Sequence, residues 1–378
     1  MRGRSKKIII IMALCMMILG NMPVSGVIGA ETGINAEQEN LKELYEKAEV
    51  KKVDTISQES GESGFFQEQL VTVKVLSGKY KGQVFEARNT LSGSPGWDIE
   101  VNPGDRVLLY ISEENEEVSE VYISDMARAS YVNYLVIAFI LVLILIGGLK
   151  GIKSLLALGL TVLAIYKILL PAILKGSSPL VVTILVLAVV TFLTMFIIGG
   201  LTRKSMAATL GTIGGVMIAG LLAILVGDLA YLSGFATEES RMLLFIDGFE
   251  VDMQGLLFAG IIIGALGATM DVAMSIASAI DEVRKANPNL NTWQLIGAGM
   301  NVGRDIMGTM TNTLILAYAG GALPLLLLYM AYNTPGMRIF NSELIATEIV
   351  RAIVGSIGLV CCVPITASIS GVLSKKSK

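Results

Sequence analysis

The sequence predicts a mainly α, polytopic helical membrane bundle of about seven spans that carries a small exported all-β domain. Two observations predict this fold class: 53% of the residues are hydrophobic and lie in long continuous runs, and shorter alternating runs precede them. Each long run is at or near the ~20 residues that cross a bilayer. The seven predicted spans, which form one domain over 131–374, are 131–149, 153–174, 179–200, 205–231, 254–280, 305–332 and 346–372.

Basic residues on alternate connections predict the orientation of these spans. The other connections are acidic or sparsely charged. Because cytoplasmic loops carry an excess of lysine and arginine, we expect the C-terminus in the cytoplasm and residues 31–130 outside. The basic positions are Lys150 and Lys153, Arg203 and Lys204, Arg284 and Lys285, and Lys375, Lys376 and Lys378.

The N-terminal segment 1–30 has the composition of a targeting sequence. It has a basic start, a short apolar core over 8–19 and an ending of small residues. This pattern predicts a signal peptide, with an uncleaved anchor as the alternative. The polar, acidic segment 31–64 is expected to form a short helix followed by a linker rich in serine and glycine.

Residues 65–127 predict an exported, OB-like β barrel. Val71, Val73 and Val75 alternate along one strand face, and the run Asn-Pro-Gly-Asp at 102–105 predicts a turn before another strand. Several short strands within about sixty residues are typical of a small barrel. Residues 31–130 carry 20 acidic against 10 basic residues, which argues against nucleic acid as a partner.

The residue types that are absent or rare limit the chemistry of the chain. There is no histidine, and none of the three cysteines falls in the exported region. The usual imidazole metal ligand and near-neutral proton carrier are therefore missing, and no disulfide framework is available. We expect no metal, no cofactor and no catalytic residue, and any proton chemistry falls to carboxylates.

Asp271 is the first candidate site residue, because it lies well inside the fifth predicted span. A carboxylate at that depth costs about 2.5–3.5 kcal/mol on an insertion scale, so it is by default a functional hypothesis. We expect it to take up and release a proton or to bind a cation. The alternative is a structural hydrogen bond to a neighbouring helix.

A polar stripe in the sixth span supplies further candidates for proton or ion coupling. Asp305, Thr309 and Asn312 follow one another at spacings of four and three, which puts them on one side of a helix. We expect this stripe to face Asp271 and Ser275 on the fifth span. The alternative interpretation is that small polar residues only hold the helices together.

Other charged residues in the spans have weaker claims to function. Asp228 lies near the outer end of the fourth span, where water can reach it, and is a further ion-coupling candidate. Lys167 is expected to be structural, with its long side chain extended toward the interface. Glu348 and Arg351, one turn apart at the start of the last span, are expected to pair.

Glycines recur in the spans at intervals that favour helix packing. Because small residues let helix backbones approach closely, they predict a tightly packed bundle rather than a catalytic loop. The positions are Gly211 and Gly215, then Gly260, Gly264 and Gly267, and finally Gly355 and Gly358.

Several motifs resemble those of YibE/F-like membrane proteins. They are the barrel segment 71–82 with the run that begins at Asn89, the run that begins at Thr202, and above all GATMDVAMSIASA from Gly267 and NVGRDIMGTMTNTL from Asn301. The resemblance covers most of the chain after residue 65 and implies a bacterial inner or cell membrane. It implies no agreed biochemical role and supplies no site residue.

A fainter likeness is to the permease half-units of secretion-accessory and resistance-nodulation proteins. These also run from an in-membrane aspartate through a charged cytoplasmic connection into a threonine-rich helix, as Asp271, 281–285 and 309–313 do here. The likeness implies proton-driven work at the aspartate, although the exported domain here is smaller and the span count differs.

These observations leave two functions open. The first is a transporter or proton-coupled permease component that moves an unknown small solute or ion across the lipid bilayer, as a homo-oligomer or with a partner membrane subunit. The second is a non-catalytic membrane scaffold or assembly factor that holds a partner through the exported β domain. An intramembrane aspartyl protease is disfavoured, because Asp228 and Asp271 lie at different depths and the Gly-x-Gly-Asp pattern is absent.

Overall fold

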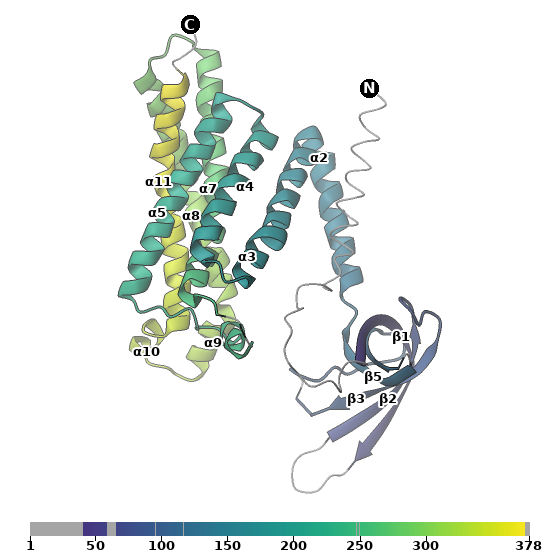
Figure 1. The fold of residues 1–378 in the computed structure, drawn as a ribbon. Coiled ribbons are helices and arrows are strands. Elements are labelled where there is room, and N and C mark those ends of the chain that lie inside the picture. Colours follow the sequence, from purple (N-terminus) through teal and green to yellow (C-terminus); the bar gives the residue numbers. More distant parts are fainter. Residues whose placement is uncertain are drawn as a thin grey trace, which may run out of the picture. The chain divides into compact units, whose positions relative to one another are not determined.

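The computed structural model describes residues 41–58, 66–94, 96–115, 117–246, 248 and 250–374 of the chain. The chain divides between Val142 and Leu143 into two compact units. The first unit contains all the strands and the start of the first helix, and the second is helical (Figure 1). The predicted signal peptide and the predicted linker rich in serine and glycine lie outside the described residues.

The strands form a closed five-stranded barrel. They are β1 (Leu41–Gln58), β2 (Phe66–Val75), β3 (Val84–Leu91), β4 (Arg106–Glu114) and β5 (Glu117–Met126). Around the barrel their order is β1-β2-β3-β5-β4, and all neighbours are antiparallel except β3 and β5. The predicted alternation in β2 is confirmed, because Val71, Val73 and Val75 are all buried in the barrel core.

The helix predicted within 31–64 is wrong for the residues that the structure describes, because Leu41–Gln58 forms β1. The strand was not predicted because Glu46 interrupts the alternation of apolar residues. Its side chain is buried on the same face of the strand as Ala48 and Val50. The first part of β1 pairs with β4 and the second part with β2. These long-range pairings outweigh the local helical spacing. The β domain therefore begins at β1 and not at residue 65.

Glu46 holds the turn between β2 and β3 against the barrel. Its carboxylate accepts a hydrogen bond from the backbone N–H of Lys79 at 2.6 Å. Gly78 in this turn has a φ of 76°, and a Cβ there would collide with the Glu46 side chain. A second buried carboxylate, Glu113, is 2% exposed and lies 3.0 Å from the Lys79 ammonium. Both carboxylates inside the barrel are therefore satisfied.

The rest of the described chain is mainly helical. Thr202 and Asn291 accept hydrogen bonds from the first-turn backbone of the helices that follow them, which explains where these two helices begin. The elements are α2 (Ala129–Ala164), a π-helical turn (Ile165–Leu169), α3 (Leu170–Leu174), α4 (Pro179–Gly199), α5 (Arg203–Leu229), α6 (Glu238–Met242), a 3-10 turn (Leu243–Phe245), α7 (Met253–Ala286), α8 (Thr292–Gly321), α9 (Leu323–Ala331), α10 (Gly336–Phe340) and α11 (Glu343–Ser374).

The described residues contain five helices long and apolar enough to cross a membrane, or six if α8 and α9, which meet at a bend of 55°, form one broken span. A membrane bundle is therefore supported, whereas the predicted count of seven is not confirmed. One of the five runs from Ala129 to Leu174 and is interrupted at Gly148, where the backbone is non-helical (φ 52°, ψ −131°). A Cβ at Gly151 would collide with the Leu143 carbonyl, so the chain folds back on itself there.

Helices α5, α7 and α11 pack against one another in the bundle (Figure 1). Gly215 of α5 lies against the backbone carbonyl of Gly358 on α11, so the predicted role of these two glycines in close packing is confirmed. Gly260 and Gly267 of α7, by contrast, have open space where a Cβ would be. The prediction of close helix packing is therefore wrong for Gly260 and Gly267 within a single copy of the chain.

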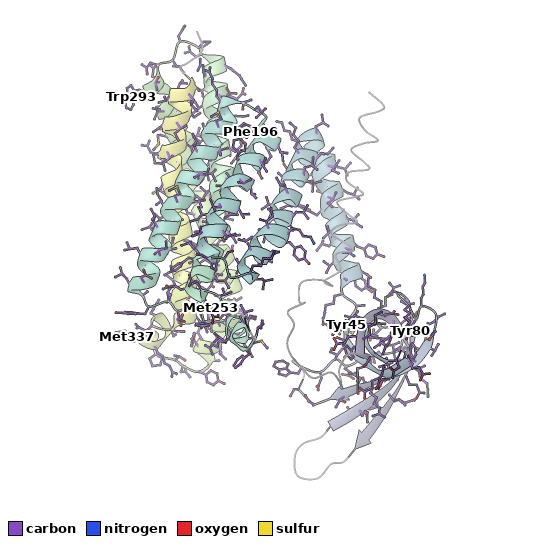
Figure 2. The ribbon with its side chains drawn as sticks, in the orientation of Figure 1. Tyr45, Tyr80, Phe196, Met253, Trp293 and Met337 are labelled. Atoms are coloured by element: carbon purple, nitrogen blue, oxygen red, sulfur yellow. The ribbon has the colours of Figure 1, made fainter. Side chains whose placement is uncertain are left out.

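The two ends of the bundle carry different loops. Figure 2 shows Trp293, at the start of α8, at one end, and Met253 and Met337 at the other. A polar cavity of about 210 Å³ at the Trp293 end brings together Arg203, at the start of α5, and Arg284, near the end of α7. Two of the basic loops that the sequence predicts to be cytoplasmic, those with Arg203 and with Arg284, therefore lie at the same end of the bundle.

Candidate functional site

The candidate site centres on α7, whose two sides differ in character. Asp252 caps the helix by accepting a hydrogen bond from the Gly255 N–H at 2.8 Å, and the apolar side of α7 packs against α5, α8 and α11. Another side carries small and polar residues spaced three or four apart, so that they form one continuous stripe, although one of them, Gly264, lies against Tyr318 of α8. This α7 stripe, exposed or half-buried throughout, consists of Gly260, Gly264, Gly267, Asp271, Ser275, Ser278 and Glu282.

Asp271 lies in the middle of the α7 stripe. Its side chain is exposed, while the adjacent Val272 and Ala273 are fully buried. It makes no hydrogen bond or ion pair with any residue that the structure describes. Ser275, one turn further along, is likewise exposed. The two fifth-span candidates therefore share the outer side of the bundle.

Helix α8 carries a second exposed polar stripe, formed by Asp305, Thr309 and Asn312 as their spacing predicted. The Thr309 hydroxyl donates to the backbone carbonyl of Ile306 at 2.9 Å. Within the described part of the chain, the side chains of Asp305 and Asn312 have no hydrogen-bond or ion-pair partner. This α8 stripe therefore has unused donors and acceptors on the outside of the bundle.

The predicted contact between the two stripes is not found among the described residues. Helix α7 instead contributes Val272, Ile276 and Ile280 to an apolar cluster that includes Leu295 of α8. Ile280 also lies against Gly299 of α8. Apolar side chains pack against a glycine surface without leaving a charge unpaired, whereas two carboxylates with no cation between them are costly to bury together. Both stripes therefore lie on the outer surface of the bundle.

Asp228 belongs to one end of the bundle and not to the α7 stripe. It is exposed near the end of α5, where its carboxylate accepts a hydrogen bond from the Gln254 side chain at 3.1 Å. Asp271 is 17 residues beyond Gln254 on α7, which is about 25 Å at 1.5 Å per residue. This separation argues against an aspartyl dyad.

Three further charged residues of the spans, Glu348, Arg351 and Lys167, have local contacts. The predicted pair of Glu348 and Arg351 is confirmed, with 3.3 Å between Oε1 and Nη1. The Lys167 ammonium lies 5.0 Å from the centroid of the Tyr166 ring. Among the residues with a described structure, no group of three or more histidine, cysteine, aspartate or glutamate side chains could hold a metal ion.

A row of tyrosines on the barrel is a feature that the sequence analysis missed. Tyr45 of β1 pairs with Tyr110 of β4, which in turn pairs with Tyr122 of β5. Tyr45 and Tyr122 are 58% and 38% exposed, and the Tyr45 and Tyr110 rings meet edge to face with centroids 5.5 Å apart (Tyr45 is labelled in Figure 2). Each tyrosine could be assigned to an outer face, but their alignment depends on the strand register.

Family models match both parts of the chain. The model described as the YibE/F family N-terminal domain matches residues 43–126, which is the barrel from within β1 to the end of β5. The model described as YibE/F-like protein matches residues 135–376, which includes both polar stripes. The chain belongs to the YibE/F-like family. The first match also begins within β1, in agreement with the corrected start of the β domain.

Membership of the YibE/F-like family confirms the resemblance that the motifs at Gly267 and Asn301 suggested. Together with the apolar helices, it supports a membrane protein. No curated protein and no solved structure matches the chain. The roles of the two stripes therefore follow from the geometry of this chain alone.

Proposed function

We propose that the protein is a transporter or a proton-coupled permease component in which the α7 and α8 stripes line the path of a small solute or ion. The observation that carries the proposal is the α7 stripe, with Asp271 exposed at its middle on a helix long and apolar enough to span a membrane. A carboxylate that faces lipid at that depth costs about 2.5–3.5 kcal/mol. Asp271 must therefore face a water-filled path or be shielded from lipid by a partner subunit.

A second copy of the chain, or a partner membrane subunit, would supply that cover. Gly260 and Gly267 leave open space on the same side of α7, and small residues let another helix backbone approach closely. Such an interface would enclose Asp271 and Ser275 between subunits. Because the chain has no histidine, carboxylates are the groups suited to carry a proton along the path.

The proposed setting is a bacterial cell or inner membrane, with the barrel outside and the C-terminus in the cytoplasm. The helical run Ala129–Leu174 has 46 residues, too many for one crossing, and its break at Gly148 supports two spans. Counting α8 and α9 as one further span gives the predicted seven. The grouping of Arg203 and Arg284 at one end supports the orientation by the positive-inside rule. The strand order supports an OB-like barrel.

The substitution Asp271→Asn tests this proposal, because asparagine keeps the size of the side chain but cannot release a proton. A strain that lacks the gene would be screened for changed sensitivity to metals, antibiotics and pH. The wild-type chain should restore the phenotype and Asp271→Asn should not, while both reach the membrane equally. In proteoliposomes with an entrapped pH-sensitive dye, the variant should lose coupled proton flux.

Asp228→Asn is the matched control for this experiment. Asp228 is also an exposed carboxylate of the bundle, but it lies near the end of α5, where it accepts a hydrogen bond from the Gln254 side chain at the start of α7. The Asp228→Asn protein should therefore retain proton flux and rescue the deletion strain. Full pH-dependent activity of the Asp271→Asn protein would rule out the coupling role, and the α7 stripe would then be a surface for helix association.

The second function, a non-catalytic scaffold or assembly factor, is favoured by the tyrosine row. Exposed aromatic residues are enriched where proteins bind one another, and the acidic balance of residues 31–130 disfavours nucleic acid. A scaffold should tolerate Asp271→Asn but lose its phenotype when Tyr45 and Tyr122 are both replaced by serine. A transporter should show the reverse pattern. Neither function requires a catalytic residue.

A further inference from the structure

A cavity of about 380 Å³ lies where α8 bends into α9 and the two helices meet α11. Gly321 and Ala322, at the 55° bend, border it together with Thr347 and Arg351 of α11. Breaks in spanning helices free backbone groups and are found beside ligand sites in membrane proteins. The volume suits a small organic molecule.

Arg351 and Glu348 form the charged part of the cavity wall. Nη1 of Arg351 lies 3.3 Å from Oε1 of Glu348, which engages one corner of the guanidinium. Nε of Arg351 is buried and has no hydrogen-bond partner in the described chain. The guanidinium carbon lies 5.9 Å from the centroid of the Tyr318 ring on α8, an arrangement that steadies the group beside the cavity. One donor edge of Arg351 is therefore unused.

Thr347 adds a second unsatisfied polar atom to the same wall. It precedes Arg351 by one turn of α11, so the two residues lie on the same side of the helix. It is only 4% exposed, and its hydroxyl has no hydrogen-bond partner among the described residues. Buried polar groups without partners are costly and uncommon, and a bound molecule is one way to satisfy them.

We propose that this cavity binds a small organic monoanion that has a carboxylate head and a short apolar tail. The carboxylate accepts hydrogen bonds from Arg351 and Thr347, because a planar guanidinium edge matches the oxygens of a carboxylate. Because Glu348 lines the same cavity and already engages Arg351, a second negative charge on the ligand would be left unpaired. The apolar wall that receives the tail includes Ala317, Leu325 and Leu344.

The site is independent of proton coupling at Asp271, and it also explains one glycine of the α7 stripe. A Cβ at Gly264 would collide with the Tyr318 hydroxyl. The missing side chain lets Tyr318 lie between α7 and the cavity, where its ring steadies Arg351. Gly264→Ala should therefore weaken anion binding although residue 264 does not line the cavity.

Calorimetry on the full chain, purified in a neutral detergent, tests the proposal with sodium butyrate as the probe. Butanol and butylammonium have the same tail but lack the carboxylate. Butyrate should bind at least about tenfold more tightly than either. Arg351→Gln should weaken butyrate binding by at least about tenfold. Arg338→Gln, which changes an exposed arginine on α10 at the same end of the bundle, should leave it unchanged.

Thr347→Val covers the case in which Arg351→Gln leaves Glu348 unpaired and fails to fold. Valine has the same shape but no hydroxyl, so the ligand-free protein should melt at the same or a higher temperature. Its affinity for butyrate should nevertheless fall about three- to tenfold. Asp271→Asn should bind butyrate as the wild type does. Equal affinity for butyrate and butanol, no butyrate binding by the wild type, or unchanged affinity in Thr347→Val would overturn the proposal.

Discussion

The barrel and the bundle treat their carboxylates in opposite ways. In the barrel, Glu113 is 2% exposed and lies 3.0 Å from the Lys79 ammonium. In the bundle, Asp271 is exposed and has no partner in the described chain. A domain in water can leave charges outside and must satisfy those that it buries. In a spanning helix the outward charge is the one that requires an explanation, because lipid cannot solvate it.

The largest expected effect concerns the strand that closes the barrel. A soluble fragment of residues 41–128 should fold, whereas 65–127 should not, because the shorter fragment lacks β1 between β2 and β4. Circular dichroism and thermal unfolding distinguish the two fragments. A cooperative transition in 65–127, which lacks β1 and Glu46, would show that the barrel folds without this strand and without the hydrogen bond from Lys79 to Glu46.

The next effect tests whether buried carboxylates hold the barrel together. Glu46→Ala removes the acceptor of the Lys79 N–H, so it should lower the free energy of unfolding of the 41–128 fragment by about 2–3 kcal/mol. Urea unfolding measures the change. Glu86→Ala, an exposed glutamate on β3, should stay within about 0.5 kcal/mol of the wild type. Equal losses in both variants would contradict a special role for Glu46.

A pair of glycines sharpens the comparison inside the bundle. Gly215→Ala places a methyl group against the Gly358 carbonyl and should destabilise the protein in detergent by about 1–2 kcal/mol. In Gly267→Ala the added methyl group has no neighbour within the same chain, so the melting temperature should be unchanged. The substitution should instead weaken any oligomer in size-exclusion chromatography. A drop in melting temperature for Gly267→Ala as large as that for Gly215→Ala would mean that the α7 stripe is already packed.

The smallest expected effect is acid sensitivity of the barrel. The Tyr80 hydroxyl and the Lys79 ammonium beside Glu113 hold the pKa of that carboxyl below its usual value. A lowered pKa stabilises the folded state above the unfolded-state value of about 4.3, and this contribution is lost as the pH falls through the folded value. The 41–128 fragment should therefore lose stability below about pH 4.3. The Glu113→Gln fragment should lose less stability over the same pH range. Identical curves of unfolding free energy against pH for the wild-type and variant fragments would show that Glu113 does not cause the acid sensitivity.

Features that depend on nearby residues could be predicted from the sequence. The alternation from Val71 to Val75 needs only the strand period of two. The predicted turn at 102–105 is present, with the Asn102 N–H donating to the Asp105 carboxylate at 2.8 Å. The pair of Glu348 and Arg351 needs only one helical turn. In each case the partners lie within a few positions of one another.

Features that depend on distant residues could not be predicted. Glu46 turns inward because the backbone of Lys79, 33 positions away, satisfies it, and no local pattern reveals that partner. Similarly, the spacing shows that the α8 stripe lies on one side of its helix, but not which neighbour that side faces. The rotation of α8 is set by contacts such as Gly299 against Ile280, which belong to the packed bundle.

The position of β1 also bears on how the chain is made. In the proposed orientation, residues 31–130 cross the membrane in chain order after the N-terminal segment, so β1 emerges before its partner β4. The barrel closes only when β5 has followed, and β5 ends at Met126, directly before α2 begins at Ala129. Closure therefore coincides with the arrival of the first spanning helix. A closed barrel is too wide to return through a channel that passed an unfolded chain, so folding outside makes export a one-way step.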